Sequence, residues 1–249
     1  MCIFLWLSAG DCPAQSVTKK KAQNYKKSPT RANPPPACLP YKIRRVRGAL
    51  CLCMEEMKDT ALLVIDMQRD FVEADGALPV AGAAATVGEI ARCAAEMRRR
   101  GATVVHVVRA HHPSGSDAET FRRRLFESGG GYCVEGTRGA EIVDGLAPCP
   151  GDVVVRKTRF SGFFRTELDE VLRSRGIARV VVAGTQYPNC IRATAVDALA
   201  RDYRVEVATD CCSAASEAVA VANVADMRLM GIRCEPWRRL SEFCAEPIA

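Results

Sequence analysis

The chain has 249 residues, of which 48% are hydrophobic and 26% charged. This length suits one α/β domain with an appendage, and no apolar run approaches the roughly 20 residues of a membrane span. The net charge of +6 is unevenly placed, because residues 1–58 hold 11 Lys/Arg against 3 Asp/Glu and the rest holds 24 against 26. Composition therefore supports neither a nucleic-acid partner nor a membrane partner for the folded part.

Residues 1–58 are predicted to be a disordered basic extension, because their Lys-, Pro- and Ser-rich composition cannot build a core. Three explanations stay open: an organelle transit peptide, a basic tail for an anionic surface, or translated sequence upstream of a start at Met54. The last is favoured, because only a short segment separates Met54 from the first strand. The apolar stretch Cys2–Leu7 is too short for a signal-peptide core. We expect a cytoplasmic protein, with organelle targeting by residues 1–53 as the alternative.

Residues 59–240 alternate between apolar strands and amphipathic helices, and residues 241–249 form a C-terminal tail. The predicted elements are strands 60–65, 103–108, 152–156, 179–183, 204–208 and 231–235, and helices 83–100, 117–127, 165–175, 190–201 and 216–230. This alternation predicts an α/β fold: a doubly wound, mainly parallel sheet of about six strands with helices on both faces, in three layers.

Three of the predicted strands end at residues with reactive side chains. Asp66 follows the first strand, Lys157 follows strand 152–156, and Cys190 opens a helix after the Gly-, Pro- and Asn-containing segment 184–189. The carboxyl ends of parallel strands are where ligand sites form. Taken singly, each residue also has an ordinary structural explanation. Asp66 could be a turn or helix cap, Lys157 a solvated surface lysine, and Cys190 a small apolar residue of the core. Because a helix N-terminus favours a thiolate, we expect a lowered pKa for Cys190.

The residues around these three positions form recognisable motifs. Asp66 lies in Val-Ile-Asp-Met-Gln-Arg-Asp-Phe, Lys157 in Arg-Lys-Thr-Arg-Phe-Ser-Gly-Phe, and Cys190 in Gly-Thr-Gln-Tyr-Pro-Asn-Cys-Ile-Arg. In this order and spacing they resemble the isochorismatase-like cysteine hydrolase superfamily, which includes nicotinamidases, carbamoyl-amide hydrolases, ureidoacrylate hydrolases and isochorismatases. The resemblance runs from about Asp59 to about Arg239.

The resemblance implies a catalytic role for each motif residue. Cys190 would attack a carbonyl carbon, and the resulting thioester would then be hydrolysed. Asp66 would be the base that takes the thiol proton and later protonates the leaving nitrogen. Lys157 would keep Asp66 ionised and stabilise the thiolate.

The resemblance also implies an oxyanion site in the turn before Cys190. It places a cis peptide bond at Thr185–Gln186, with the N–H groups of Gln186 and Cys190 directed at the oxyanion. Pro188 is the more obvious cis candidate from the sequence alone. The side chains expected to contact substrate are Gln68, which could instead bond Asp66, and the aromatic residues Phe71, Phe160, Phe163 and Tyr187.

One departure from the family concerns metal binding. Nicotinamidases of the superfamily carry Asp-x-His after the second strand and a further His downstream. Here the stretch is Arg109-Ala-His-His-Pro113, with Ala110 in place of the aspartate, and His106 is the one remaining histidine. The cysteines lack zinc-type spacing and suit a reducing compartment. We predict a domain without metal or cofactor, for which nicotinamide is a poor substrate.

The leading hypothesis is a metal-independent cysteine hydrolase that cleaves an amide, ureide or carbamoyl C–N bond of a small molecule. One alternative is an isochorismatase-type enol-ether hydrolase, a branch that commonly lacks the cysteine. The other is a catalytically silent binding or regulatory protein. The resemblance further implies a homo-oligomer, a dimer or tetramer, and the long segment 111–150 is expected to lie at an interface near the site.

Overall fold

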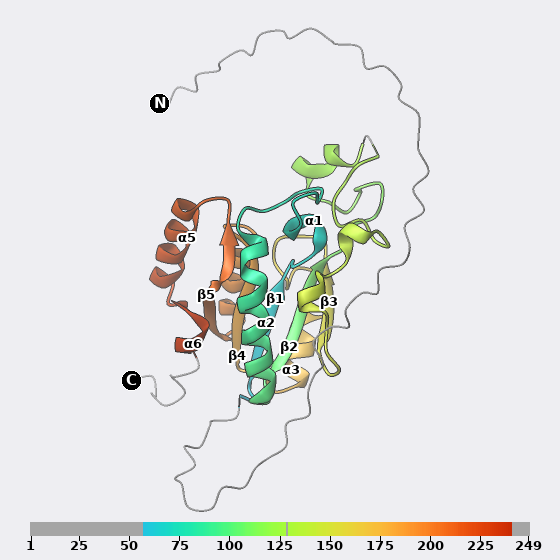
Figure 1. The fold of residues 1–249 in the computed structure, drawn as a ribbon. Coiled ribbons are helices and arrows are strands. Elements are labelled where there is room, and N and C mark those ends of the chain that lie inside the picture. Colours follow the sequence, from blue (N-terminus) through green and yellow to red (C-terminus); the bar gives the residue numbers. More distant parts are fainter. Residues whose placement is uncertain (1–56, 128, 241–249) are drawn as a thin grey trace, which may run out of the picture. The chain divides into compact units, whose positions relative to one another are not determined.

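The computed structural model describes residues 57–127 and 129–240 (Figure 1). Nearly all of the predicted extension and the tail 241–249 lie outside the described residues, so the three explanations for the extension stay open. The strands are β1 (Thr60–Ile65), β2 (Thr103–Arg109), β3 (Val153–Lys157), β4 (Arg179–Tyr187), β5 (Arg204–Ala214) and β6 (Arg233–Glu235). The α-helices are α1 (Arg69–Val72), α2 (Ala83–Arg99), α3 (Leu168–Ser174), α4 (Cys190–Leu199), α5 (Glu217–Leu229) and α6 (Trp237–Leu240). Among the described residues, no helix combines the length and apolarity needed to cross a membrane.

The six strands form one parallel sheet in the order β3-β2-β1-β4-β5-β6. This confirms the predicted doubly wound α/β fold. The strand order reverses at β1, which pairs with β2 on one side and with β4 on the other. In open α/β sheets, ligands bind beyond the carboxyl ends of the strands at such a reversal. The fold therefore predicts a ligand site beside the residues that follow β1 and β4.

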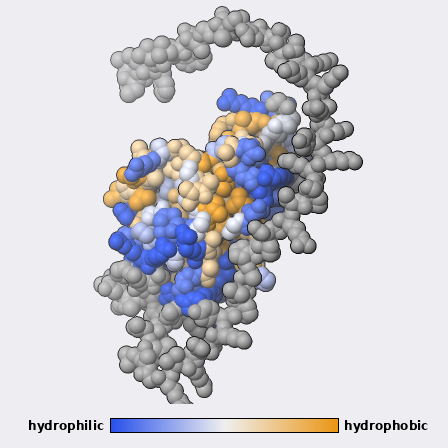
Figure 2. Space-filling model, viewed as in Figure 1, coloured by the Kyte–Doolittle hydropathy of each residue, from blue (hydrophilic) through white to orange (hydrophobic). Residues whose placement is uncertain are grey.

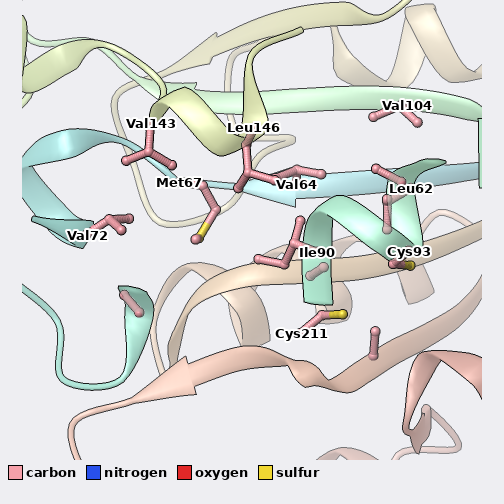
Figure 3. Packing of buried hydrophobic residues seen from close by; sticks show 14 of the residues in the cluster. Leu62, Val64, Met67, Val72, Ile90, Cys93, Val104, Val143, Leu146 and Cys211 are labelled. Carbon is pink, nitrogen blue, oxygen red and sulfur yellow. The ribbon is translucent and has the colours of Figure 1, made fainter. Parts of the chain in front are cut away.

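Helices cover both faces of the sheet, as Figure 1 shows for α2 in front and α3 behind. Alternate residues of β1 point to opposite faces, so Leu62 and Val64 pack with α2, while Leu63 packs in the core formed with α3, α4 and α5. Figure 3 shows the first of these cores, where Ile90 and Cys93 of α2 lie against Leu62. All six residues of β1 are buried, as a central parallel strand requires.

Strand β4 extends further than the sequence predicted, to Tyr187 instead of residue 183. The segment 184–189 was expected to break regular structure, but β4 continues past Gly184 with register shifts against β5. Gly184 has φ 117°, and a Cβ there would collide with the backbone of Ile65 in β1. The glycine therefore serves a close approach between two strands, a requirement that local composition does not reveal.

The segment 111–150 contains no long helix. The helix predicted over 117–127 is the short 3-10 helix η1 (Thr120–Leu125), and two more 3-10 turns follow, η2 (Arg138–Ala140) and η3 (Asp144–Leu146). Asp70 Oδ2 accepts a hydrogen bond from the Cys133 N–H at 2.6 Å. This hydrogen bond ties the segment to α1, near the carboxyl edge of the sheet.

Asp152, just before β3, has a buried carboxylate whose contribution to stability can be tested. Its carboxylate lies 3.1 Å from His106 Nε2 and accepts hydrogen bonds from Arg98 Nη2 at 2.6 Å and the Cys149 N–H at 2.9 Å. Burial alone would raise the pKa of Asp152, but these hydrogen bonds outweigh it and lower the pKa to about 2. Because the folded pKa lies below the unfolded value, the ionised carboxylate stabilises the fold above pH ~4.

We expect Asp152→Asn to lower the melting temperature at pH 7, because it removes this paired charge. The difference from the wild type should shrink as the pH falls from about 4 toward 2, since both proteins then carry a neutral group at this position. Asp75→Asn is the control, because the Asp75 side chain is exposed. A gap in melting temperature that does not change with pH would contradict this reading.

Candidate active site

Four side chains meet beyond the carboxyl ends of β1 to β4. Asp66 follows β1, Arg109 ends β2, Lys157 ends β3, and Cys190 begins α4 after β4. Their exposed fractions are 1%, 0%, 2% and 6%, in that order. The structure thus brings together the three residues predicted from the motifs and adds a fourth, Arg109.

Asp66 and Lys157 form a buried ion pair. Lys157 Nζ donates to Asp66 Oδ2 at 2.8 Å and to the backbone oxygen of Arg159 at 3.1 Å. Asp66 has φ 52°, in a region that aspartate tolerates better than most residues, and its N–H donates to Val107 O at 2.9 Å. Its second oxygen, Oδ1, has no hydrogen-bond partner among the described residues. The carboxylate is held by one oxygen and can accept a proton at the other.

The expected lowering of the Cys190 pKa is wrong. Burial raises the pKa of the Cys190 thiol and the negative charge of Asp66 raises it further, while the charges of Lys157 and Arg109 lower it. Loss of water around the sulfur outweighs the helix N-terminus, whose effect is modest even where it is exposed. The resting side chain of Cys190 is therefore a thiol.

The end of β4 and the residue that follows it contain two cis peptide bonds, Thr185–Gln186 and Tyr187–Pro188. Ser213 Oγ donates to Thr185 Oγ1 at 2.8 Å, which joins the turn to β5. Since α4 begins at Cys190, the Cys190 N–H has no partner within the helix. The participation of this N–H and that of Gln186 in an oxyanion site stays a prediction.

Arg109 is the site residue that sequence reasoning missed. Its Nη2 donates to Cys190 Sγ at 3.4 Å, its Nη1 donates to Glu119 Oε1 at 2.8 Å, and its Nε lies 4.0 Å from Asp66 Oδ2. The stretch Arg109-Ala-His-His-Pro113 was interpreted through metal binding, which gave Arg109 no role. One signal could have found Arg109: like Asp66 and Lys157, it stands at the end of a strand.

Gln68 holds the backbone of Arg109 and is not directed at substrate or at Asp66. Its Nε2 donates to Arg109 O and to Ala140 O, both at 2.7 Å, and its Oε1 accepts from the Arg109 N–H at 2.7 Å. Both amide hydrogens are therefore used. The predicted substrate contact of Gln68 is corrected to a positioning role, which ties the end of β2 to the segment 111–150.

Of the four aromatic residues predicted to line a pocket, Phe160 lies beside the site, with its ring centroid 5.6 Å from the guanidinium of Arg109. Phe71, Phe163 and Tyr187 are buried in the two hydrophobic cores. Because Asp66 and Cys190 are just as buried, a contact of these three aromatic residues with substrate stays a prediction.

The carboxylate partner of Arg109, Glu119, is held by further contacts within the segment 111–150. Tyr132 OH donates to Glu119 Oε2 at 3.2 Å, and Arg122 Nη1 donates to Tyr132 OH at 3.1 Å. The guanidinium of Arg122 also lies over the rings of Tyr132 and Phe160, at 5.3 Å and 5.2 Å from their centroids. This segment therefore fixes the charged partner of Arg109.

The residues after β2 do not fit a divalent metal ion. His111 is fully buried, and its Nε2 lies 3.5 Å from Arg109 Nη1, so a metal on that nitrogen would meet a permanent cation. Burial and the charge of Arg109 lower the pKa of His111. His112 is exposed and faces Ser114. Across residues 57–127 and 129–240, no group of three or more His, Cys, Asp or Glu side chains is arranged for metal binding.

The isochorismatase domain family matches residues 60–237 of the chain. The chain belongs to the isochorismatase family. This isochorismatase-family protein is 43% identical over 194 residues to an Arabidopsis thaliana protein named "probable inactive nicotinamidase", covering 77% of this chain and 99% of the relative. It is 34% identical over 163 residues to a ureidoacrylate amidohydrolase of Variovorax paradoxus, covering 58% of this chain and 65% of the relative. A crystal structure of an isochorismatase family protein from Desulfovibrio vulgaris shares 54% identity with a TM-score of 0.74, covering 76% of this chain and 99% of that chain.

The charges around Cys190 predict opposite effects of two substitutions on its labelling. We expect Asp66→Asn to move the pH midpoint of Cys190 alkylation by iodoacetamide to lower pH, because it removes an anion beside the thiol. Lys157→Met should move it to higher pH, because it removes a cation. Mass spectrometry of the labelled peptide gives both midpoints. Shifts in the same direction would contradict this electrostatic account.

Proposed function

We propose that this isochorismatase-family protein is a metal-independent cysteine hydrolase that cleaves a C–N bond of a small molecule through a thioester. The observation that carries the proposal is the buried Asp66–Lys157 pair, with Asp66 Oδ1 unpartnered, beside the thiol of Cys190. This arrangement supplies a nucleophile, a base and a fixed counter-charge in a site closed to water.

The first half-reaction forms the thioester. As Cys190 Sγ bonds to the substrate carbonyl carbon, its proton passes to Asp66 Oδ1, and the carbonyl oxygen becomes an oxyanion. The N–H groups of Gln186 and Cys190 would hold this oxyanion, and loss of one such donor costs about 2.7–4 kcal/mol. Asp66 then gives the proton to the leaving nitrogen as the C–N bond breaks. Lys157 remains protonated throughout.

The second half-reaction restores the enzyme. A water molecule attacks the thioester carbon and Asp66 takes its proton. The C–S bond breaks as that proton returns to sulfur, and the acid product leaves. Each proton that Asp66 accepts is returned within the same half-reaction, so no cofactor is needed to balance the cycle.

Two observations favour this function over the alternatives. The presence of Cys190 argues against an enol-ether hydrolase of the isochorismatase type, and the complete Asp66–Lys157–Cys190 arrangement argues against a silent binding protein. Relatives named as ureidoacrylate amidohydrolases support C–N chemistry. The relative named a probable inactive nicotinamidase agrees with our expectation that nicotinamide is a poor substrate.

A hydrolysis screen over small amides, ureides and carbamoyl amino acids tests the proposal. We expect turnover of at least one class, loss of turnover in Cys190→Ala, and a loss of about 10²–10⁴-fold in kcat for Asp66→Asn. Activity should survive chelator treatment, because no metal takes part. Cys149→Ala is the control for loss of a cysteine outside the site. Turnover that persists in Cys190→Ala, or that the chelator abolishes, would overturn the mechanism.

We also propose that the protein forms at least a dimer. On α5, apolar side chains at helical spacing face solvent: Ala218, Val221, Ala222, Ala225 and Leu229. Leu229 is 88% exposed and Val221 62%. Figure 2 shows hydrophobic surface on the side of the molecule where α5 lies. A solvent-facing apolar stripe on a helix is typical of a surface that another chain covers. Phe121, in the segment first expected at the interface, is also 63% exposed.

Light scattering of the full chain should give a mass of at least twice 27.0 kDa. Leu229→Glu should reduce it, because a buried unpaired carboxylate is costly at an apolar interface. Val154→Glu, which places the same charge on the exposed edge strand β3, should leave the mass unchanged. A wild-type monomer that is fully active at nanomolar concentration would remove the interface from the mechanism.

A further inference from the structure

We propose that Arg109 is a further catalytic residue, whose Nη2 stabilises the negative charge that develops on Cys190 Sγ when the thiol loses its proton. The proposal rests on the proposed function, in which Cys190 is the nucleophile. It extends that function by dividing the work between two cations: Lys157 holds the base, and Arg109 stabilises the sulfur.

Arg109 contacts the reacting atom itself. Its Nη2 donates to Cys190 Sγ at 3.4 Å, and both side chains are buried. A thiol sulfur is a weak acceptor, but a thiolate carries a full charge, so this hydrogen bond strengthens once the proton has left. An interaction that is stronger during attack than at rest lowers the activation barrier.

Lys157 does not fill this role alone. Its Nζ donates to Asp66 Oδ2 at 2.8 Å and to Arg159 O at 3.1 Å, so two of its three N–H groups are used. Burial raises the pKa of the Cys190 thiol most, and Asp66 raises it by more than Lys157 lowers it. The ion pair as a whole therefore opposes a thiolate, and Arg109 supplies the cation that offsets this effect.

The guanidinium is fixed and charged before the reaction begins. Gln68 bonds both backbone groups of Arg109 at 2.7 Å, while Nη1 donates to Glu119 Oε1 at 2.8 Å and to Thr158 O at 3.4 Å. Burial alone would lower the pKa of Arg109, but the negative charges around it, that of Cys190 first, raise the pKa well above its usual range. The positive charge is thus preorganised beside the sulfur, and no reorganisation is needed at the moment of attack.

The proton and the negative charge of the thiol take separate partners. As the S–H bond breaks, the proton goes to Asp66 Oδ1, which has no hydrogen-bond partner among the described residues. The electron pair stays on sulfur, beside Arg109 Nη2, and forms the C–S bond. In the second half-reaction the C–S bond breaks and the pair returns to sulfur. Arg109 keeps its own proton and acts in both half-reactions.

Alkylation of Cys190 tests the contact without knowledge of the substrate. Iodoacetamide reacts with the thiolate, so the pH midpoint of labelling, followed by mass spectrometry, reports the pKa of the thiol. We expect Arg109→Gln in the full chain to raise this midpoint by about 1–3 pH units, the usual effect of an opposite charge at close range. At a fixed pH below the midpoint, the labelling rate should fall by the same factor, about 10–1000-fold.

Two further variants bracket this result. Arg109→Lys should give a smaller rise, because it retains the charge but loses the planar guanidinium. Arg156→Gln is the matched control and should not move the midpoint, since its side chain is 68% exposed on the neighbouring strand β3. An unchanged midpoint in folded Arg109→Gln would overturn the proposal.

A double variant separates the contact from net charge and covers misfolding of Arg109→Gln, which leaves the Glu119 carboxylate without its cation. Arg109→Gln/Glu119→Gln removes one charge of each sign. We expect it to fold, as a thermal melt would show, and to keep the raised midpoint, because Arg109 contacts Sγ while Glu119 is bonded to the other terminal nitrogen. Glu119→Gln alone should not raise the midpoint. A double variant with the wild-type midpoint would contradict the proposal.

Kinetics distinguish catalysis from substrate binding. On a substrate found in the hydrolysis screen, Arg109→Gln should lower kcat by about 10²–10³-fold, as loss of an oxyanion donor does, and leave KM nearly unchanged. A raised KM with an unchanged kcat would show that Arg109 binds substrate, contrary to the proposal.

The two proposals fail separately, because labelling needs no turnover. A raised labelling midpoint in Arg109→Gln with no hydrolysis of any substrate class would contradict the proposed function alone. Hydrolysis by the wild type, with a labelling midpoint that Arg109→Gln does not change, would contradict this inference alone.

Discussion

The buried ion pair between Lys157 and Asp66 is the interaction on which the rest of the site depends. Two charges withdrawn from water are tolerated only if they are paired and hydrogen-bonded, and removal of one partner from such a pair costs about 3–5 kcal/mol. The pair joins the ends of β3 and β1, which are not neighbours in the sheet, since β2 lies between them. The last residue of β2, Arg109, is consequently placed between the pair and Cys190.

This arrangement decides the protonation state of Cys190. Asp66 and Glu119 balance Lys157 and Arg109, so a resting thiolate on Cys190 would add a third anion to a site that excludes water. Burial therefore raises the pKa of the thiol even at a helix N-terminus. In the proposed reaction, the positive charges would stabilise the negative charge that develops on sulfur and oxygen during attack, which is when electrostatic stabilisation accelerates a reaction.

The parts of the site that the sequence could predict are those carried by local pattern. Asp66, Lys157 and Cys190 each follow an apolar run, and parallel strands end at the same edge. Arg109 and Gln68 were misjudged for a different reason: their roles depend on which strands are neighbours and on partners far along the chain. Gln68 bonds backbone groups 41 and 72 residues away, which no periodicity encodes. The burial that raises the Cys190 pKa likewise appears only once the layers are packed.

The residues around Cys190 come from two kinds of structure, the rigid sheet edge and the irregular segment 111–150. Arg109 is held by Gln68 from the rigid sheet edge, but its carboxylate partner, Glu119, comes from the irregular segment 111–150. Changes in that segment can therefore alter the charge beside Arg109 without moving Asp66, Lys157 or Cys190. A guanidinium cannot be deprotonated in a protein, so Arg109 keeps its positive charge beside Cys190 whatever the pH. In the proposed function, the strand ends would supply the chemistry and the segment 111–150 the specificity, the division of roles by which folds acquire new functions.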